Sequence, residues 1–235
     1  MVEAYRSHNQ LLAALPTEDF ELLRPFLSTV EMVQESVLVA AGDRLTHVYF
    51  PHSGIISLVV SLTDGQMVEV AMIGHDSLFG GSAALDGQIS LTDAVVLLPG
   101  TASILDLDRL RMASEESAAF RHLLTRHEQA LFSQAQQTAA CNAAHATEMR
   151  LARCLLRMHD LSEVSVLPLT QDALAQMIGV KRNSTSASAH ALQEAGVIKY
   201  TRGKIQITDL EGLKNLTCEC YKAVAVQYNR LLRDD

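Results

Sequence analysis

The sequence predicts an α+β protein in which an N-terminal antiparallel β-roll precedes a long helix and a C-terminal winged helix-turn-helix. Glycines recur every 9 to 12 residues from Gly42 to Gly74, a spacing typical of short strands joined by turns. No glycine occurs from Thr101 to Ile178, where alanine, glutamine, leucine and arginine favour helix. A helix-turn-helix spacing follows around Gly179. We therefore expect a β-roll domain over residues 1–115, a long helix over 116–145 and a winged-helix domain over 146–235.

The composition is that of a folded globular chain. Of the 235 residues, 48% are hydrophobic and 20% charged, which argues against disorder. The longest apolar runs, such as residues 94–99, are far shorter than the roughly 20 residues that cross a bilayer, and the start lacks a signal-peptide pattern. We expect a cytoplasmic protein with no membrane partner. The four cysteines are too few and too scattered for a disulfide framework, so we interpret them as thiols.

The β-roll is predicted from about Val37 to Leu107, after a short helical pattern in the first thirty residues. Here short runs of valine, isoleucine and leucine alternate with turn residues. Asp64 and Gly65 separate the apolar runs 56–60 and 67–72, and this arrangement predicts a β-hairpin, because glycine adopts positive φ without steric cost.

A helix from Ser117 to Ala143 would be about 40 Å long at 1.5 Å per residue. Residues spaced alternately four and three apart lie on one stripe of it and suit a paired helix. We interpret this stripe as the seam of a two-fold dimer. The alternative is a helix packed on its own domain, which the polar members of the stripe favour. The stripe comprises Phe120, Leu124, His127, Leu131, Gln134, Thr138 and Cys141.

The helix-turn-helix is predicted from local signals. Thr170 is a suitable N-cap, and Asp172 in the first turn complements the helix dipole. This helix stops at Gly179, and a second runs from about Arg182 to residue 195. Two short strands around residues 202–203 then predict a wing.

Charge is distributed unevenly along the chain. The net charge is −8, yet residues 1–145 carry −10 and residues 146–235 carry +2. Between Lys181 and Lys204 there are five basic residues and one acidic residue, Glu194. Such a basic patch gains free energy against DNA phosphates by counterion release, although a solvated surface with scattered lysines remains the alternative.

The order of acidic β-roll, long helix, the motif from Leu169 to Arg182 and the wing over residues 200–204 resembles the Crp/Fnr family of bacterial transcription regulators. Residues 151–156 and 218–221 resemble a branch of this family with no assigned ligand. The resemblance covers nearly the whole chain. It implies a homodimer in which each second helix of the motif lies in the major groove of one DNA half-site.

The resemblance also implies roles for individual residues. Arg182 occupies the place of the base-reading arginine, Asn183 replaces a glutamate and would read adenine, and Ser186 is a further contact to a base or to phosphate. Ala187 replaces a DNA-contacting arginine, so we expect a different operator. Thr185 and Ser188 stand where apolar residues usually anchor this helix. Phosphate contacts are assigned to Thr170, Lys181, Arg202 and Lys204.

The corresponding sensor pocket lacks the residues that hold a cyclic nucleotide in this family. Gly81 stands where the ribose-binding glutamate should be, Leu91 replaces the phosphate-binding arginine, and Asp93 nearby would repel phosphate. We therefore expect no cyclic nucleotide. The candidate effector pocket contains Gly80, Gly81, Ser82 and Thr92, for an unidentified small molecule.

Metal cofactors are not expected either. An iron–sulfur sensor needs clustered cysteines near the N-terminus, and none precedes Cys141. Cys218 and Cys220 form a pair too closely spaced and unaccompanied for a zinc site. The nine histidines show no ligand-like spacing, so haem is not expected. Buried thiols are the preferred interpretation, with a redox contact between Cys141 and its symmetry mate as the alternative.

Enzyme motifs for phosphate binding, serine nucleophiles and zinc proteases are missing, so we expect no enzyme. The sequence predicts a homodimeric transcription regulator whose sensor domain controls its affinity for double-stranded DNA, with RNA polymerase as a further partner. The alternative is an interaction module whose winged helix docks a protein.

Overall fold

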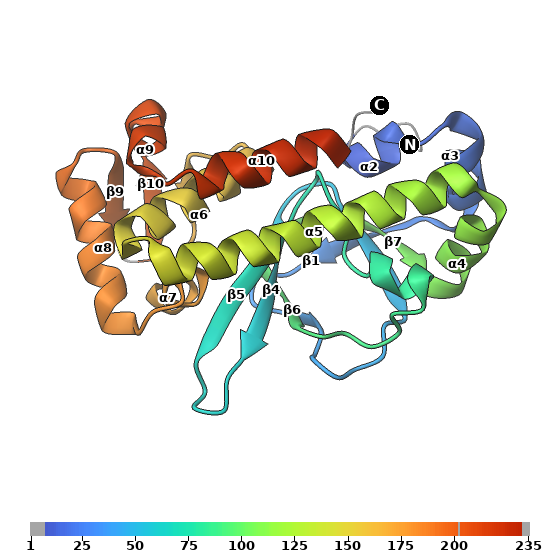
Figure 1. Ribbon diagram of the computed structural model, residues 1–235, viewed down its shortest axis with the longest axis horizontal. Coiled ribbons are helices and arrows are strands. Elements are labelled where there is room, and N and C mark those ends of the chain that lie inside the picture. The colour runs from blue at the N-terminus through green and yellow to red at the C-terminus, as the bar shows by residue number, and fades with distance from the viewer. Residues whose placement is uncertain (1–7, 202, 232–235) are drawn as a thin grey trace.

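The computed structural model describes residues 8–201 and 203–231, without the side chains of residues 182, 183 and 231. The molecule is elongated, and one long helix, α5, spans most of its length (Figure 1). The β-roll lies against the middle and one end of α5, and the winged helix-turn-helix lies at the other end. This confirms the predicted α+β class and the order of its parts.

Two short helices and a 3₁₀ turn precede the roll: α2 (Gln10–Ala14), α3 (Thr17–Leu23) and η1 (Arg24–Phe26). Asn9 caps α2 by accepting a hydrogen bond from the Leu12 N–H through its side-chain oxygen. Its side-chain nitrogen donates to the carbonyls of Pro51 and Ser77, both at 2.9 Å. One buried side chain therefore caps the helix and fastens it to the roll.

The β-roll consists of two antiparallel sheets. One has the strand order β1–β7–β3 and the other β2–β6–β4–β5. The predicted hairpin joins β4 to β5, and Gly65 in its turn has a φ of 83°. The 3₁₀ helix η2 (Gly81–Leu85) lies between β5 and β6. The strands are β1 (Ser28–Met32), β2 (Val37–Val39), β3 (His47–Pro51), β4 (Ile55–Ser61), β5 (Met67–Ile73), β6 (Asp93–Leu98) and β7 (Gly100–Asp106).

Helix α4 (Leu107–Glu116) leads into the 27-residue helix α5 (Ala118–Ala144), which begins at the N-cap Ser117 as predicted. The dimer-seam interpretation of its stripe is wrong, because these side chains face the chain's own roll and C-terminal helix. Leu131 is half-buried and packs on the sensor core. The other members expose 5% or less of their surface: Phe120, Leu124, His127, Gln134, Thr138 and Cys141. The alternative, a helix packed on its own domain, describes this stripe.

The C-terminal part contains the winged helix-turn-helix and two further helices. A three-stranded sheet of order β8–β10–β9 forms the wing. The elements are α6 (Thr147–Ser162), β8 (Val166–Leu167), α7 (Gln171–Ile178), α8 (Arg182–Glu194), β9 (Ile198–Thr201), β10 (Lys204–Ile207), α9 (Leu210–Leu216) and α10 (Cys220–Leu231). A separate core runs through this part and includes Leu155, Leu174, Leu192 and Ile205.

The last helix leaves the winged-helix part. Helix α10 runs back along α5 towards the N-terminal helices (Figure 1), and Val224 and Tyr228 join the sensor core. Residues 146–235 therefore do not pack as one unit. In the described part of the chain, no helix is long and apolar enough to cross a membrane.

Candidate nucleic-acid interface and sensor pocket

The first helix of the motif has the predicted ends. The Thr170 hydroxyl oxygen accepts a hydrogen bond from the Ala173 N–H at 3.1 Å, which caps the N-terminus of α7. Gly179 ends α7 with a φ of 61°, and the Val180 N–H donates to the Ala175 carbonyl. A Cβ on Gly179 would lie 3.2 Å from the side-chain nitrogen of Asn142, a tight contact that a small shift of that side chain would have to relieve.

The second helix, α8, has an anchored inner face. Thr185 and Ser188 are fully buried, together with Ala189 and Leu192. Ser188 donates a weak hydrogen bond to the Ser184 carbonyl at 3.4 Å, while the Thr185 hydroxyl has no partner among the described residues. Two hydroxyl side chains thus occupy the anchoring positions.

The outer face of α8 is exposed and carries small or polar side chains, namely Ser184, Ser186, Ala187 and His190. The backbone of Arg182 and Asn183 forms the first turn of this helix, but their side chains lie outside the described residues. No sequence pattern pointed to His190. It lies one turn after Ser186 on the same face and forms a 3.3 Å contact with Glu194.

The wing lies beside α8. Lys204 pairs with Thr201 across the β9–β10 hairpin, and the Tyr200 N–H donates to the Gln193 side chain of α8 at 2.8 Å. The side chains of Lys181, Lys199 and Lys204 are exposed. Arg202 lies outside the described residues. Three exposed lysines thus lie just before α8 and on the two wing strands. Helix α8 and the wing lie together at one end of the molecule (Figure 1).

The helix-turn-helix is seated directly on the β4–β5 side of the roll. The ideal Cβ position of Gly179 is 3.4 Å from Val68, and the Gln34 side chain donates to the Pro168 carbonyl at 3.0 Å. Gly74, after β5, has no room for a Cβ because Leu161 of α6 is packed against it. The two halves of the molecule are in tight contact.

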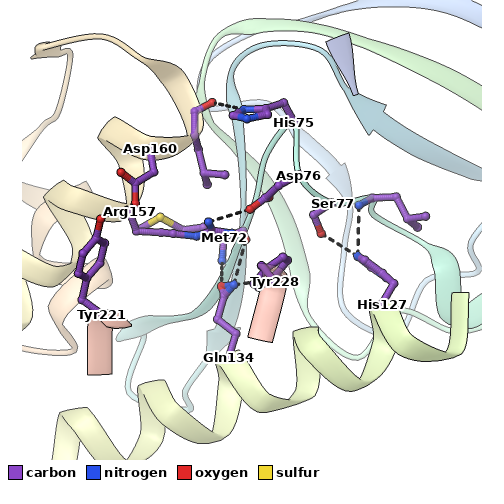
Figure 2. A network of polar contacts seen from close by, with 12 residues as sticks. Met72, His75, Asp76, Ser77, His127, Gln134, Arg157, Asp160, Tyr221 and Tyr228 are labelled. Carbon is purple, nitrogen blue, oxygen red and sulfur yellow. Dashed lines mark hydrogen bonds and ion pairs between the residues drawn. The ribbon is translucent and has the colours of Figure 1, made fainter. Parts of the chain in front are cut away.

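A buried polar network joins the halves (Figure 2). Arg157 of α6 forms a 2.8 Å ion pair with Asp76, in the loop after β5, and stacks over the Tyr228 ring at 4.6 Å. Burial alone would lower the pKa of Arg157, but the neighbouring Asp76 carboxylate raises it above its usual value. Burial also raises the pKa of Tyr228 to about 12, so its hydroxyl is neutral. Within the network, Arg157 and Asp76 thus compensate each other's charge.

Helix α5 contributes to the same network through two polar members of the buried stripe. The Gln134 side chain accepts from the Met72 N–H at 2.6 Å and donates to the Tyr228 hydroxyl at 3.1 Å. His127 accepts from the Leu78 N–H at Nε2, so its Nδ1 carries the proton and donates to Glu128 at 3.2 Å. These polar residues therefore bond to their own chain and are not seam residues.

A cavity of 560 Å³ lies between the roll and α5. Gly80, Ser82 and Thr92 line its wall, while Gly81 lies behind the wall, where a Cβ would meet the Glu128 carboxylate. Among the described residues that line this cavity there is no arginine or lysine, and two carboxylates, Asp86 and Glu128, are present. Arg111 pairs with Asp86 at 2.8 Å, while Glu128 lies 3.2 Å from the His127 ring nitrogen.

Leu91 and Asp93, which stand where the sequence places a cyclic-nucleotide cassette, offer no cationic group. Leu91 is 90% exposed. Asp93 accepts hydrogen bonds from the Ala41 N–H and the Ser61 hydroxyl, both at 2.8 Å. Among its described lining residues, the cavity thus has no cation that could pair with a phosphate group.

Comparison with known proteins agrees with this architecture. Residues 29–117 match the family model of the cyclic nucleotide-binding domain, and residues 149–216 match that of the Crp-like helix-turn-helix domain. No curated protein sequence is similar enough to count as a match.

Several solved structures share the fold. FixK2 from Bradyrhizobium japonicum is 15% identical, with 82% of this chain and 98% of that chain covered and a TM-score of 0.70. A Crp/Fnr-family transcriptional regulator from Thermus thermophilus is 22% identical, covers 80% and 97%, and has a TM-score of 0.63. The c-di-GMP-responsive global regulator CLP of Xanthomonas campestris is 13% identical, covers 82% and 99%, and has a TM-score of 0.67.

A cyclic-nucleotide-binding-like roll joined by a long helix to a winged helix-turn-helix defines a DNA-binding transcription regulator. The two matched domains, in this order on one chain, show that the chain belongs to the Crp/Fnr family.

Proposed function

We propose that the protein is a homodimeric, sequence-specific regulator whose β-roll controls its affinity for DNA, and that it acts by binding and not by catalysis. The observation that carries the proposal is the difference in burial between the two faces of α8. Its inner face is buried against α6 and α7, and its outer face is exposed beside Lys181, Lys199 and Lys204. A helix presented in this way fits the major groove, with the lysines on the phosphates.

Within this interface we assign the contacts by position. Arg182, Asn183 and Ser186 on the first turns of α8 read bases, and Lys181, Arg202, Lys204 and the Thr170 hydroxyl bind phosphate. We add His190, whose exposed imidazole lies further along the same face. Among the described side chains of the outer face, Ser184, Ser186 and Ala187 are small, which favours close approach of the helix to the base edges.

The homodimer is supported by a second stripe on α5, on the side opposite the buried one. Its members are again spaced alternately four and three apart, but all are exposed: Ala118, His122, Thr125, Gln129, Phe132, Gln136, Ala139 and Ala143. Phe132 is 65% exposed. An exposed stripe with this spacing, whose C-terminal half includes Ala139 and Ala143, suits the packing of two parallel helices about a two-fold axis.

The effector is expected to bind in the 560 Å³ cavity between the roll and α5. The lining is mainly apolar, and the Glu128 carboxylate, oriented by His127, is available to accept a hydrogen bond. We therefore expect an apolar ligand with a donor or cationic group, in place of a cyclic nucleotide. Because Phe132 lines this cavity and lies on the exposed stripe, the ligand would bias the dimer between two DNA affinities. Family membership also supports RNA polymerase as a partner of the DNA-bound dimer.

Selection of bound sites from random duplex DNA tests this function. We expect an enriched two-fold symmetric sequence. Binding to it should weaken with salt, with a log–log slope of about 0.9 per phosphate contact. Recovery of random sequences only, together with salt-independent capture of a protein, would favour the alternative of a protein-docking winged helix.

A further inference from the structure

Three cysteines and one histidine converge where the end of α5 meets the start of α10. Cys141 lies in the last turn of α5, and His145 is the C-cap residue one turn later. Cys218 and Cys220 lie at the start of α10. The sulfur atoms and a ring nitrogen of this group all lie within 4.8 Å of one another. Cys218 and Cys220, which have no further ligand near them in the sequence, are thus joined by Cys141 and His145 in the folded chain.

The separations fit a tetrahedral metal site. The Cys141 and Cys218 sulfurs are 3.6 Å apart, and the Cys220 sulfur is 3.5 Å from the Nδ1 of His145. Ligands placed tetrahedrally around Zn²⁺, at about 2.3 Å for sulfur and about 2.0–2.1 Å for nitrogen, lie about 3.8 Å apart for two sulfurs and about 3.5 Å apart for sulfur and nitrogen. A disulfide would need about 2.05 Å between the sulfurs.

The surroundings suit a bound cation with thiolate ligands. The three cysteines are 0%, 3% and 1% exposed, so water is largely excluded from the sulfurs. Three thiolates and a neutral imidazole around Zn²⁺ carry a net charge of about −1. The buried Arg153 guanidinium interacts electrostatically with Cys141 and would offset that charge.

Neighbouring side chains orient the histidine and one cysteine. The Nε2 of His145 lies 3.3 Å from the Glu219 carboxylate, so a proton on Nε2 is held there and Nδ1 is left to bind the metal. The Gln137 side chain donates to the Cys220 sulfur at 3.0 Å. Hydrogen bonds of this kind to ligating atoms are typical of metal sites.

We propose that Cys141, His145, Cys218 and Cys220 bind one structural Zn²⁺. All four positions are filled by protein ligands of the kind that zinc prefers, which is typical of structural and not catalytic sites. The ion would tie the start of α10 to the end of α5, two residues before α6 begins at Thr147. It would thereby fix the junction between the sensor and the winged helix.

Zinc content of the full-length protein, purified without chelators, tests the proposal. We expect about one Zn²⁺ per chain by elemental mass spectrometry, and replacement by Co²⁺ should give the thiolate charge-transfer and intense visible bands of a tetrahedral site. Cys218→Ser and Cys220→Ser should lose most of the metal. Cys154→Ala is the matched control, because Cys154 is equally buried but donates to the Met177 carbonyl outside the group.

The Co²⁺ spectrum of the unmodified chain keeps the test independent of variant folding. The proposal is overturned if that chain holds no zinc and gives no thiolate–cobalt band. It is equally overturned if Cys154→Ala loses as much metal as the two serine variants, or if the intact mass under non-reducing conditions shows a disulfide between Cys141 and Cys218. DNA binding is not the readout, so the outcome is independent of the proposed function.

Discussion

Arg157 and Asp76 form a nearly buried ion pair that joins the winged-helix half to the sensor half, with 2.8 Å between Nη1 and Oδ2. Arg157 belongs to α6 and Asp76 follows β5. The pair therefore joins the two domains through residues that lie far apart in the sequence. Within the described chain, Asp76 Oδ1 and two guanidinium nitrogens of Arg157 have no hydrogen-bond partner. Removal of either side chain therefore leaves a buried charge without compensation.

Arg157→Ala should lower the free energy of unfolding by about 3–5 kcal/mol, measured by urea denaturation. The matched control is Arg24→Ala, because Arg24 forms an ion pair with Glu21 in which both side chains are more than 40% exposed. That pair should contribute about 0–1 kcal/mol. Equal losses in the two variants would show that the Arg157–Asp76 pair is not a buried link.

The two faces of α5 should respond differently to substitution. Leu124 is 1% exposed, so Leu124→Ala should cost about 2–5 kcal/mol of stability. Ala139 is exposed, and Ala139→Glu should leave the stability of the protomer nearly unchanged but weaken the dimer by placing two carboxylates across the two-fold axis. Analytical ultracentrifugation and thermal melting separate the two effects. A monomeric Leu124→Ala and a dimeric Ala139→Glu would reverse our assignment of the faces.

Binding to a selected DNA site should distinguish readout from positioning. Arg182→Ala should cost about 1–3 kcal/mol and relax one base position, whereas Lys204→Ala should weaken all sequences alike and reduce the salt slope by about one contact. Lys222→Ala serves as the control, because Lys222 is exposed on α10, outside the interface. An unchanged affinity of Arg182→Ala would refute its base-reading role.

Glu69 should make stability depend on pH. This residue of β5 is 4% exposed and accepts a hydrogen bond from Ser57 at 2.6 Å. Burial raises its pKa from 4.5 to about 7, although the Ser57 hydroxyl and the nearby Arg153 lower it. The folded state thus binds the proton more tightly than the unfolded state. The resulting stability is complete below about pH 4.5 and is lost as the pH rises through about 7.

Glu69→Gln keeps the shape of the protonated side chain and removes this titration. Relative to this variant, the natural chain should lose about 1–3 kcal/mol of stability between pH 5 and 8, measured by urea denaturation at each pH. Parallel curves for the two proteins would show that Glu69 does not titrate in this range.

Cyclic AMP should not stabilise the protein. The cavity lacks a lysine or arginine among its described lining residues and carries Asp86 and Glu128. A ligand that binds the folded state raises the melting temperature with concentration, so millimolar cyclic AMP should leave it unchanged. A clear rise would mean that the nucleotide binds elsewhere or with its phosphate facing solvent.

How much could be predicted from the sequence depends on how local the signal is. Thr170, Gly179 and the hairpin at Gly65 were predicted well, because a cap, a positive φ and a tight turn are decided by a few neighbouring residues. The stripe through Leu124 and Gln134 was recognised but given the wrong partner. A helical period shows that one face is covered, and only the fold shows that β5 and α10 cover it.

The cysteine group could not be recognised for a related reason. Cys141 and Cys218 are 77 residues apart in the chain, and their contact depends on the return of α10 along α5. The same return brings Tyr228 to Gln134. Spacing rules for metal ligands describe residues that are close in the sequence. They cannot identify a site whose ligands come from helices far apart in the chain.

The path of α10 also restricts how the molecule can move. Helix α10 starts beside the winged helix and packs in the sensor core near its end, so it contacts both halves of the molecule. A large rotation of one half about a hinge after α5 would break the packing of α10 against the sensor core. We therefore expect any transition between conformations to be a shear, in which α10 slides a short distance along α5 and repacks there.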